Sequence, residues 1–184
     1  TLLTAIEGTS VRSLCGLTEG QTTADFSGQN LGPIDMKIMA AEYEFRGFIA
    51  ATTAINVLSN PIGVGAQSLI DIFESTESIR TMLGIEDGTT ALDFSGGRYG
   101  QSKLDTGCAK LLAAEFTARR CTRSVRTVVL HNNTLLGDAG LTAIMDALPP
   151  GVSLQPNFQR CGLKRVTAQL LERVSSATAL DISD

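Results

Sequence analysis

The sequence has no tryptophan and one histidine, and aromatic residues make up only 5% of its 184 positions. One histidine is too few to complete a typical zinc site with the four cysteines, none of which forms a Cys-x-x-Cys pair. No apolar run reaches the roughly 18 residues that a membrane-spanning helix needs. We therefore expect no metal, no cofactor and no direct insertion into a membrane.

Charge is scarce as well. Charged residues make up 18% of the chain, and 15 lysines and arginines against 19 aspartates and glutamates leave a net charge of −4. A nucleic-acid-binding protein usually carries a basic face, so we expect no nucleic-acid partner. No signal peptide opens the chain, and free thiols in a reducing compartment are the simpler interpretation of the cysteines, with two disulfides in a secreted protein as the alternative. An intracellular location is expected, in the cytoplasm or, as the alternative, in an organelle.

The chain repeats itself. Residues 10–28 match residues 78–96 without a gap, including two glycines and an Asp-Phe-Ser-Gly ending. Further on, the Ala-Ala-Glu of residues 40–42 matches that of residues 113–115 at a longer shift. The second copy therefore carries about five extra residues, which we place within Arg98–Gly107.

A shorter period lies inside this one. Apolar-x-apolar triplets predict strands near 24–26, 55–57, 92–94, 128–130, 152–154 and 180–182. Each triplet except the last is followed by a stretch with helical spacing of apolar residues, at 35–45, 65–74, 105–117, 138–148 and 166–174. A short strand that alternates with one helix at a period of about 24–37 residues is typical of a solenoid.

Two segments, INVLSNPIGVGAQSLIDIF and VVLHNNTLLGDAGLTAIMDAL, resemble leucine-rich repeats of the ribonuclease-inhibitor-like type. That family's pattern is L-x-L-x-x-N-x-I/L-G-x-x-G-x-x-x-L. The resemblance implies an α/β solenoid with a curved parallel sheet on the concave side and helices on the convex side. It implies a single domain over 1–184 with about five to six repeats. Because the first and last are incomplete, we expect a fragment of a longer array.

The pattern also assigns interior positions. We expect Asn60, Asn133 and Asn157 to cap backbone groups where the chain leaves each strand. Three glutamates on predicted helices, Glu42, Glu44 and Glu115, are interpreted as parts of solvated faces. The expected core comprises Val57, Ile62, Leu69, Phe94, Leu130, Leu135, Leu141, Ile144 and Leu148.

Side chains between and just after the core-facing residues of each strand should form the concave surface. Three of the six central positions are aspartate and none is basic, which predicts a protein partner with a basic surface. These candidate binding residues are Asp25, Ser27, Asn56, Leu58, Asp93, Ser95, Val129, His131, Ser153, Gln155, Asp181 and Ser183.

Two glycine motifs suggest nucleotide chemistry. Gly63-Val64-Gly65 follows a strand as in a dinucleotide-binding fold, but Ser68 stands where the third glycine should be. The Gly-rich run at 96–103 lacks the Gly-Lys-Ser/Thr ending of a phosphate loop. His131 has no nucleophile motif beside it. We therefore expect a non-catalytic protein-binding scaffold, with a constitutive structural subunit of a large assembly as the alternative and an enzyme as the third hypothesis.

Overall fold

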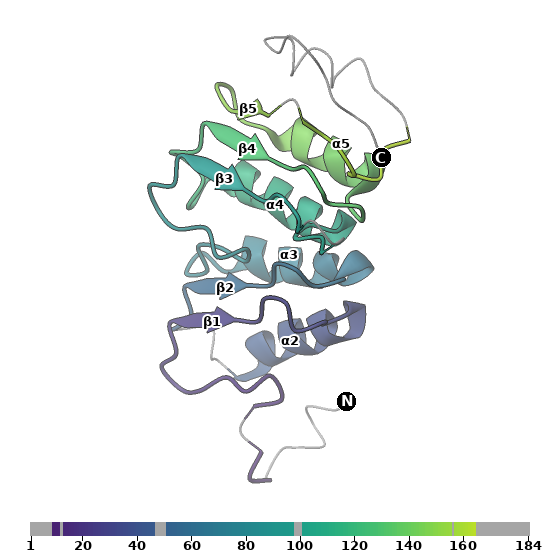
Figure 1. The fold of residues 1–184 in the computed structure, drawn as a ribbon. Coiled ribbons are helices and arrows are strands. Elements are labelled where there is room, and N and C mark those ends of the chain that lie inside the picture. Colours follow the sequence, from purple (N-terminus) through teal and green to yellow (C-terminus); the bar gives the residue numbers. More distant parts are fainter. Residues whose placement is uncertain (1–8, 12, 47–50, 98–100, 156, 165–184) are drawn as a thin grey trace.

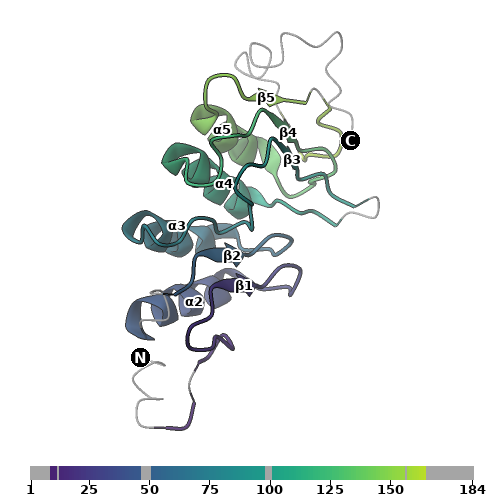
Figure 2. The same cartoon turned by 90° about the vertical axis from the view of Figure 1, so that its left-hand side faces the viewer.

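The computed structural model describes residues 9–11, 13–46, 51–97, 101–155 and 157–164. Within them, short strands alternate with helices along the chain. Figure 1 shows the strands stacked one above another, and the helices run beside them on the other side of the molecule, as the turned view in Figure 2 also shows. The elements are β1 (Thr23–Asp25), α2 (Pro33–Arg46), β2 (Ala54–Asn56), η2 (Gly63–Gly65), α3 (Ala66–Ser75), β3 (Ala91–Asp93), α4 (Thr106–Ala118), β4 (Thr127–Val129), α5 (Gly137–Ala147) and β5 (Ser153–Leu154).

The mixed α/β class is confirmed. Each of the five described strands overlaps a predicted triplet, and β1 to β4 begin one residue earlier than the sequence suggests. The four predicted helices that fall on described residues are present, within two residues of the predicted bounds. The strand predicted at 180–182 and the helix predicted at 166–174 lie outside the described residues.

Neighbouring strands are parallel, as predicted. Strand β1 pairs with β2, and β3 pairs with β4, which pairs with β5. The prediction of one sheet is wrong, because the described strands form a two-stranded and a three-stranded sheet. Residues 80–84 lie along the edge of β2 that does not pair with β1, and they form isolated bridges there and no strand. The Ile55 N–H donates to the Thr81 carbonyl at 2.9 Å, and the Gly84 N–H donates to the Ile55 carbonyl at 2.9 Å.

The core lies between the strands and the helices, and eight of the nine predicted core residues are buried. Leu135 is the exception, since it is 56% exposed, whereas Leu136 is fully buried. The physical reason is a turn that is one residue longer than its counterpart. Ile62 follows Asn60 by two residues, whereas Leu136 follows Asn133 by three, so the inward position moves along the chain by one residue.

Two asparagines occupy the interior as predicted. The Asn60 side-chain amide donates to the Phe26 carbonyl at 2.8 Å and to the Val57 carbonyl at 3.0 Å. The Asn133 amide donates in the same way to the Phe94 and Leu130 carbonyls, at 2.8 and 2.6 Å. Each asparagine thus connects its own turn to the residue that directly follows the strand of the preceding unit, which satisfies backbone groups that would otherwise be buried without partners.

Asn157 does not take the third such place. The register pairs Val128 with Leu154 and not with Val152, so the predicted alignment of this unit is displaced. The half-buried Asn157 side chain accepts a hydrogen bond from the Gln159 N–H at 3.0 Å. The buried Cys161 thiol donates instead to the Leu130 carbonyl, at 3.2 Å.

The interpretation of the helix glutamates as solvated is wrong for two of them. Glu42 and Glu115 are 0% and 1% exposed. Each carboxylate accepts backbone N–H groups from an irregular segment, Leu14 and Cys15 for Glu42, and Met82 and Leu83 for Glu115. The side chain of Glu44 lies outside the described part of the structure.

Glycine allows the helices to start in direct backbone contact. A Cβ atom at Gly107 would lie 2.5 Å from the carbonyl oxygen of Gly63, and one at Gly65 would lie 2.6 Å from the Cα atom of Pro33. No side chain fits at these distances. The pairing of η2 with α2, and of α4 with η2, therefore requires glycine at both positions.

Candidate interaction surface

The strands present one row of side chains away from the helices. In β1 the middle residue, Ala24, is buried, whereas Thr23 and Asp25 are exposed. Strand β3 repeats this pattern with Ala91 and Asp93 exposed. The structure places the predicted binding residues on this face as exposed or half-buried groups, and we call it the open strand face. The described members are Asp25, Ser27, Asn56, Leu58, Asp93, Ser95, Val129, His131, Ser153 and Gln155, whereas Asp181 and Ser183 lie outside the described residues.

The acidic residues of the open strand face also shape the turns that follow the strands. The Ser27 N–H donates to the Asp25 carboxylate at 2.9 Å, and the Ser95 N–H donates to Asp93 at the same distance. Asn56 makes the equivalent bond with its amide oxygen to the Leu58 N–H, at 3.1 Å. Asparagine therefore supports this turn as aspartate does, so an Asp→Asn change removes the charge and keeps the turn.

These turns keep the carboxylates ionised. The backbone hydrogen bond from Ser27 lowers the pKa of Asp25 below its ordinary value of 3.8. Hydrogen bonds from the side chain and backbone of Ser95 lower the pKa of Asp93, and the nearby Lys103 ammonium lowers it further. Both residues are therefore negatively charged at neutral pH.

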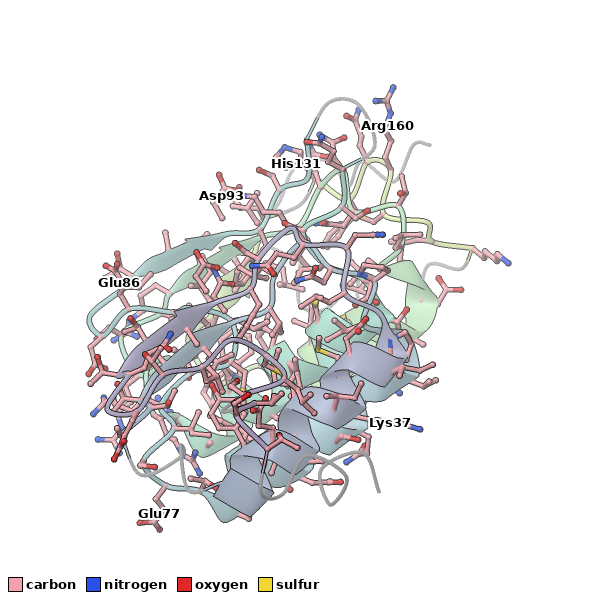
Figure 3. The ribbon with its side chains drawn as sticks, turned by 90° about the horizontal axis from the view of Figure 1, so that it is seen from below. Lys37, Glu77, Glu86, Asp93, His131 and Arg160 are labelled. Carbon is pink, nitrogen blue, oxygen red and sulfur yellow. The ribbon has the colours of Figure 1, made fainter. Side chains whose placement is uncertain are left out.

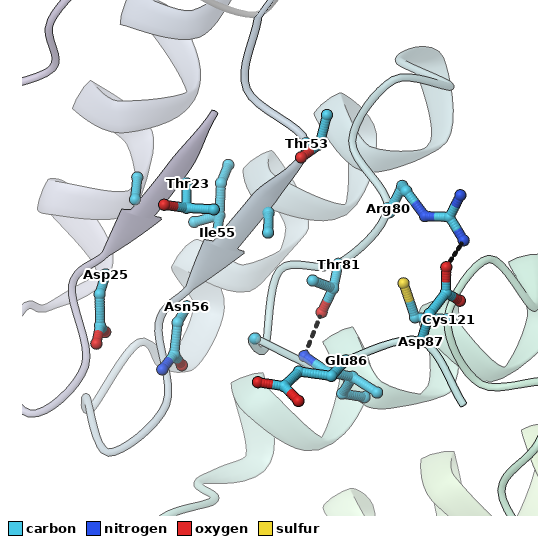
Figure 4. Close-up of a pocket in the computed structure, with 14 residues that line it drawn as sticks. Thr23, Asp25, Thr53, Ile55, Asn56, Arg80, Thr81, Glu86, Asp87 and Cys121 are labelled. Atoms are coloured by element: carbon cyan, nitrogen blue, oxygen red, sulfur yellow. Dashed lines mark hydrogen bonds and ion pairs between the residues drawn. The ribbon is translucent and has the colours of Figure 1, made fainter. Parts of the chain in front are cut away.

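A cavity of about 490 Å³ lies over β1, β2 and the loop that follows residue 80. Its floor is formed by the outward side chains of the two strands, and its wall by the loop. In the view of Figure 4, the Asn56 side chain lies between those of Asp25 and Glu86. The polar and charged side chains that line the cavity include Thr23, Asp25, Asn56, Arg80, Glu86 and Asp87.

The charge of this cavity is negative. Arg80 forms an ion pair with Asp87, drawn as a dashed line in Figure 4, and its guanidinium also donates to the Arg120 carbonyl at 3.1 Å. The cavity has two further carboxylates, those of Asp25 and Glu86, and neither forms an ion pair with Arg80. The cavity can therefore hold a cationic group beside small polar side chains.

Around β3 to β5 the open strand face is less acidic. The Lys103 ammonium donates to the Asp93 carbonyl at 3.2 Å, so a positive charge lies beside Asp93. Val129 and His131 follow on the neighbouring strand and its turn, and both are half-buried. Figure 3 shows Asp93 and His131 at the strand side of the molecule, whereas Lys37 projects from the helix side.

The sequence prediction missed the loop side of the cavity. Arg80, Glu86 and Asp87 lie in the segment 78–96, which matches residues 10–28. The spacing of its apolar residues does not indicate that these three side chains lie over β2. The signal that could have found them is the match of residues 78–96 with residues 10–28, which places the same kind of segment before β3 as before β1.

All four cysteines are free thiols. Cys121 borders the cavity and is 5% exposed, and burial raises its pKa above the ordinary 9.0. A buried thiol with a raised pKa is a poor nucleophile at neutral pH. Within the described residues, no group of three or more histidine, cysteine, aspartate or glutamate side chains is placed to hold a metal ion.

Among the described helices, none has both the length and the apolar character that crossing a membrane requires. Comparison with protein-family models gives no match to this chain, and comparison with curated proteins gives no significant match either.

Proposed function

We propose that this chain is a leucine-rich repeat solenoid of the ribonuclease-inhibitor-like type that binds a protein partner without catalysis. The observation that carries the proposal is the pair of buried asparagines, Asn60 and Asn133, each bonded to the residue that directly follows the strand of the preceding unit. The same contact in two places is what a stack of similar units requires, because each unit contacts only its neighbours. The stacked parallel strands with helices along the other side support the same proposal.

The partner is expected at the open strand face, over β1 and β2. There the cavity offers two carboxylates that Arg80 does not pair, Asp25 and Glu86, together with small polar side chains. Charge complementarity favours a partner segment that carries lysine or arginine. Because Asp25 and Glu86 are exposed, their attraction for such a segment weakens as salt screens it over about 8 Å at physiological ionic strength.

A peptide selection tests this proposal. Random 12-residue peptides are displayed on beads and selected with the protein at low salt, and the selected peptides are then titrated in solution. We expect enrichment in lysine and arginine. Replacing Asp25→Asn together with Glu86→Gln should weaken the selected peptides by roughly tenfold and flatten the salt dependence.

The matched control removes two charges from the helix side. Asp71 and Glu74 are exposed on α3, and the Asp71→Asn, Glu74→Gln variant has the same net charge as the binding variant. It should leave peptide affinity unchanged. Enrichment without charge preference, or an equal loss in both variants, would contradict binding at the open strand face.

A further inference from the structure

The loop that joins α4 to β4 concentrates positive charge in a chain whose net charge is −4. Four of the eight residues at positions 119–126 are arginine, and none is aspartate or glutamate. We call this segment the arginine loop. The side chains of Arg119, Arg123 and Arg126 are exposed, whereas Arg120 is half-buried. The loop therefore presents three guanidinium groups to solvent.

Arg120 anchors the arginine loop to the unit that precedes it. Its Nη1 atom donates to the Phe73, Thr76 and Ile79 carbonyls, at 2.7, 2.9 and 2.6 Å. The guanidinium carbon also lies 4.2 Å from the centroid of the Phe73 ring. These contacts satisfy carbonyl groups at and after the end of α3. Arg120 thus has a structural role, and it fixes the position from which the other three arginines extend.

Two of the exposed guanidinium groups are held along the loop by hydrogen bonds to its backbone. The Arg123 Nε atom donates to the Arg119 carbonyl at 3.0 Å. The Arg126 Nη1 atom donates to the Arg123 and Val125 carbonyls, at 3.1 and 2.8 Å. These bonds use only a minority of the five N–H donors that each guanidinium carries. The two groups are therefore partly ordered before binding, which lowers the entropy lost when a partner pairs with them.

The exposed arginines have no acidic partner in the part of the chain that the structure describes. The ion pair between Arg80 and Asp87 is the only one among the described residues. A guanidinium with free N–H groups is well satisfied by a carboxylate, which can accept two parallel hydrogen bonds. The arginine loop is therefore suited to a ligand that carries several carboxylates.

Residues of this chain flank the arginine loop on both sides. From the preceding unit, the Arg80 guanidinium donates to the Arg120 carbonyl at 3.1 Å. From the following unit, the Ser153 N–H donates to the Arg126 carbonyl at 2.9 Å. Both stacked neighbours are thus in place, and neither brings a carboxylate of its described residues into contact with the exposed arginines. The counter-charge is therefore expected from another molecule.

From these observations we infer that the arginine loop is a docking site for an acidic segment of a second protein, whose aspartate or glutamate carboxylates pair with Arg119, Arg123 and Arg126. Charge complementarity carries this assignment, since the loop has three exposed cations and no anion. Because each exposed ion pair contributes little by itself, the partner segment needs several carboxylates close together. The inference goes beyond the proposed function, because it concerns another surface and a partner segment of the opposite charge.

The side chains of this region disfavour two other polyanionic partners. Single-stranded nucleic acid is usually held by aromatic side chains that stack on its bases, and no aromatic side chain whose burial the structure describes is exposed. A membrane surface is bound by apolar side chains that insert beside the basic ones. The least polar residues of the arginine loop, Cys121 and Val125, are 5% and 0% exposed. An acidic protein segment needs neither feature.

The probe is a fluorescent 12-residue peptide in which glutamate alternates with serine, and its anisotropy is titrated with the full chain at low ionic strength. We expect saturable binding that weakens as salt is added, whereas a peptide with glutamine in place of glutamate should not bind. Equal binding of the two peptides, or binding of neither, would overturn the inference. So would a lower dissociation constant for a 12-nucleotide oligothymidine, or cosedimentation of the protein with vesicles of equimolar phosphatidylserine and phosphatidylcholine at the same ionic strength.

A pair of charge-matched variants locates the site. Arg123→Gln together with Arg126→Gln should weaken the binding of the glutamate peptide by roughly tenfold. Lys37→Gln together with Lys110→Gln removes the same charge from exposed positions on α2 and α4, and the affinity should change by less than about twofold. Similar effects of the two double variants would contradict docking at the arginine loop.

A third double variant separates the charge of the loop from its shape. Arg123→Lys together with Arg126→Lys keeps the positive charge and removes the guanidinium forks. It should bind the glutamate peptide within about threefold of the wild type, because the electrostatic attraction remains. A loss as large as that of the glutamine variant would show that the change had damaged the backbone of the loop, and would overturn the inference.

Discussion

The segments at 13–17 and 81–85 are two copies of one structure in different surroundings. Both use a hydroxyl, a positive-φ glycine and a buried glutamate to hold an irregular backbone. Among the residues that the structure describes, a strand is seated on the other edge of the second copy alone, and Met82 and Leu83 there are buried, whereas Leu14 and Cys15 are half-buried. The comparison teaches that the repeated sequence and the glutamate of the following helix together determine the hydrogen bonds of this segment, whereas the neighbouring unit determines its burial.

The largest expected effect comes from removing the two capping carboxylates. Glu115→Ala leaves the buried Met82 and Leu83 N–H groups and the Thr81 hydroxyl without their acceptor, and should lower the free energy of unfolding by roughly 4 kcal/mol. Glu42→Ala should cost roughly 2 kcal/mol, because water reaches the half-buried first copy more easily. Urea unfolding of both variants measures the difference. Equal losses of unfolding free energy would contradict the idea that β2, seated on the second copy, makes its capping hydrogen bonds more important for stability.

The next effect is a dependence of stability on pH. Burial raises the pKa of Glu115 from the ordinary 4.5 to about 7, against the opposing hydrogen bonds from Met82, Thr81 and Leu83. A folded-state pKa above the unfolded value means that the folded chain binds more protons between these pH values. The contribution is therefore fully present below pH 4.5 and is lost as the pH rises through about 7.

We expect this contribution to change the free energy of unfolding by about 3 kcal/mol between pH 4.5 and pH 8. Glu115→Gln cannot titrate, so the difference between wild type and this variant isolates the effect from other groups. The measurement is urea unfolding of both proteins across this pH range. Parallel pH profiles would show that Glu115 keeps an ordinary pKa.

A smaller effect separates the two glycines. A Cβ atom at Gly84 would lie 3.0 Å from the Asn56 Cγ atom, whereas one at Gly16 would meet no atom within 4 Å. Both positions have positive φ, so alanine is strained at each by roughly 1–2 kcal/mol. Gly84→Ala should therefore cost about 1 kcal/mol more than Gly16→Ala, because it also crowds β2. Thermal unfolding of the two variants tests this, and a larger cost at Gly16 would contradict it.

The smallest effect concerns thiol reactivity. Cys15 is half-buried, whereas the other three cysteines are buried, so Cys15 should be alkylated first by iodoacetamide. Burial, together with the hydrogen bond and the charge of Glu42, raises the pKa of Cys15 to about 12. Glu42→Gln should therefore speed the alkylation of Cys15 by several-fold. Peptide mass mapping over time measures both rates, and an unchanged rate would exclude an electrostatic effect of Glu42.

Much of this fold could be predicted from the sequence. The periodic apolar triplets located all five described strands, and the spacing of the asparagines identified Asn60 and Asn133 as interior groups. Both signals are local, since each depends on residues within one unit. The open strand face followed from the alternation of side chains along a strand, which explains why its members are exposed or half-buried.

The remaining features depend on contacts that are distant in sequence. Glu115 is buried because it meets backbone N–H groups more than 30 residues away, and its charge alone favours a surface position. Leu136 takes the buried position that was predicted for Leu135, because the turn after Asn133 is one residue longer than the turn after Asn60. The break between the two sheets arises because residues 80–84 occupy the edge of β2, and no periodic pattern marks that segment.

The most direct test of the account is amide hydrogen exchange at Gly16 and Gly84, measured by NMR in the same protein. The Gly84 N–H donates to the Ile55 carbonyl at 2.9 Å, whereas the first copy has no strand on that edge within the described residues. The account predicts that the Gly84 amide is strongly protected and that the Gly16 amide exchanges at nearly the rate of an unstructured peptide. Equal protection of the two amides would contradict it.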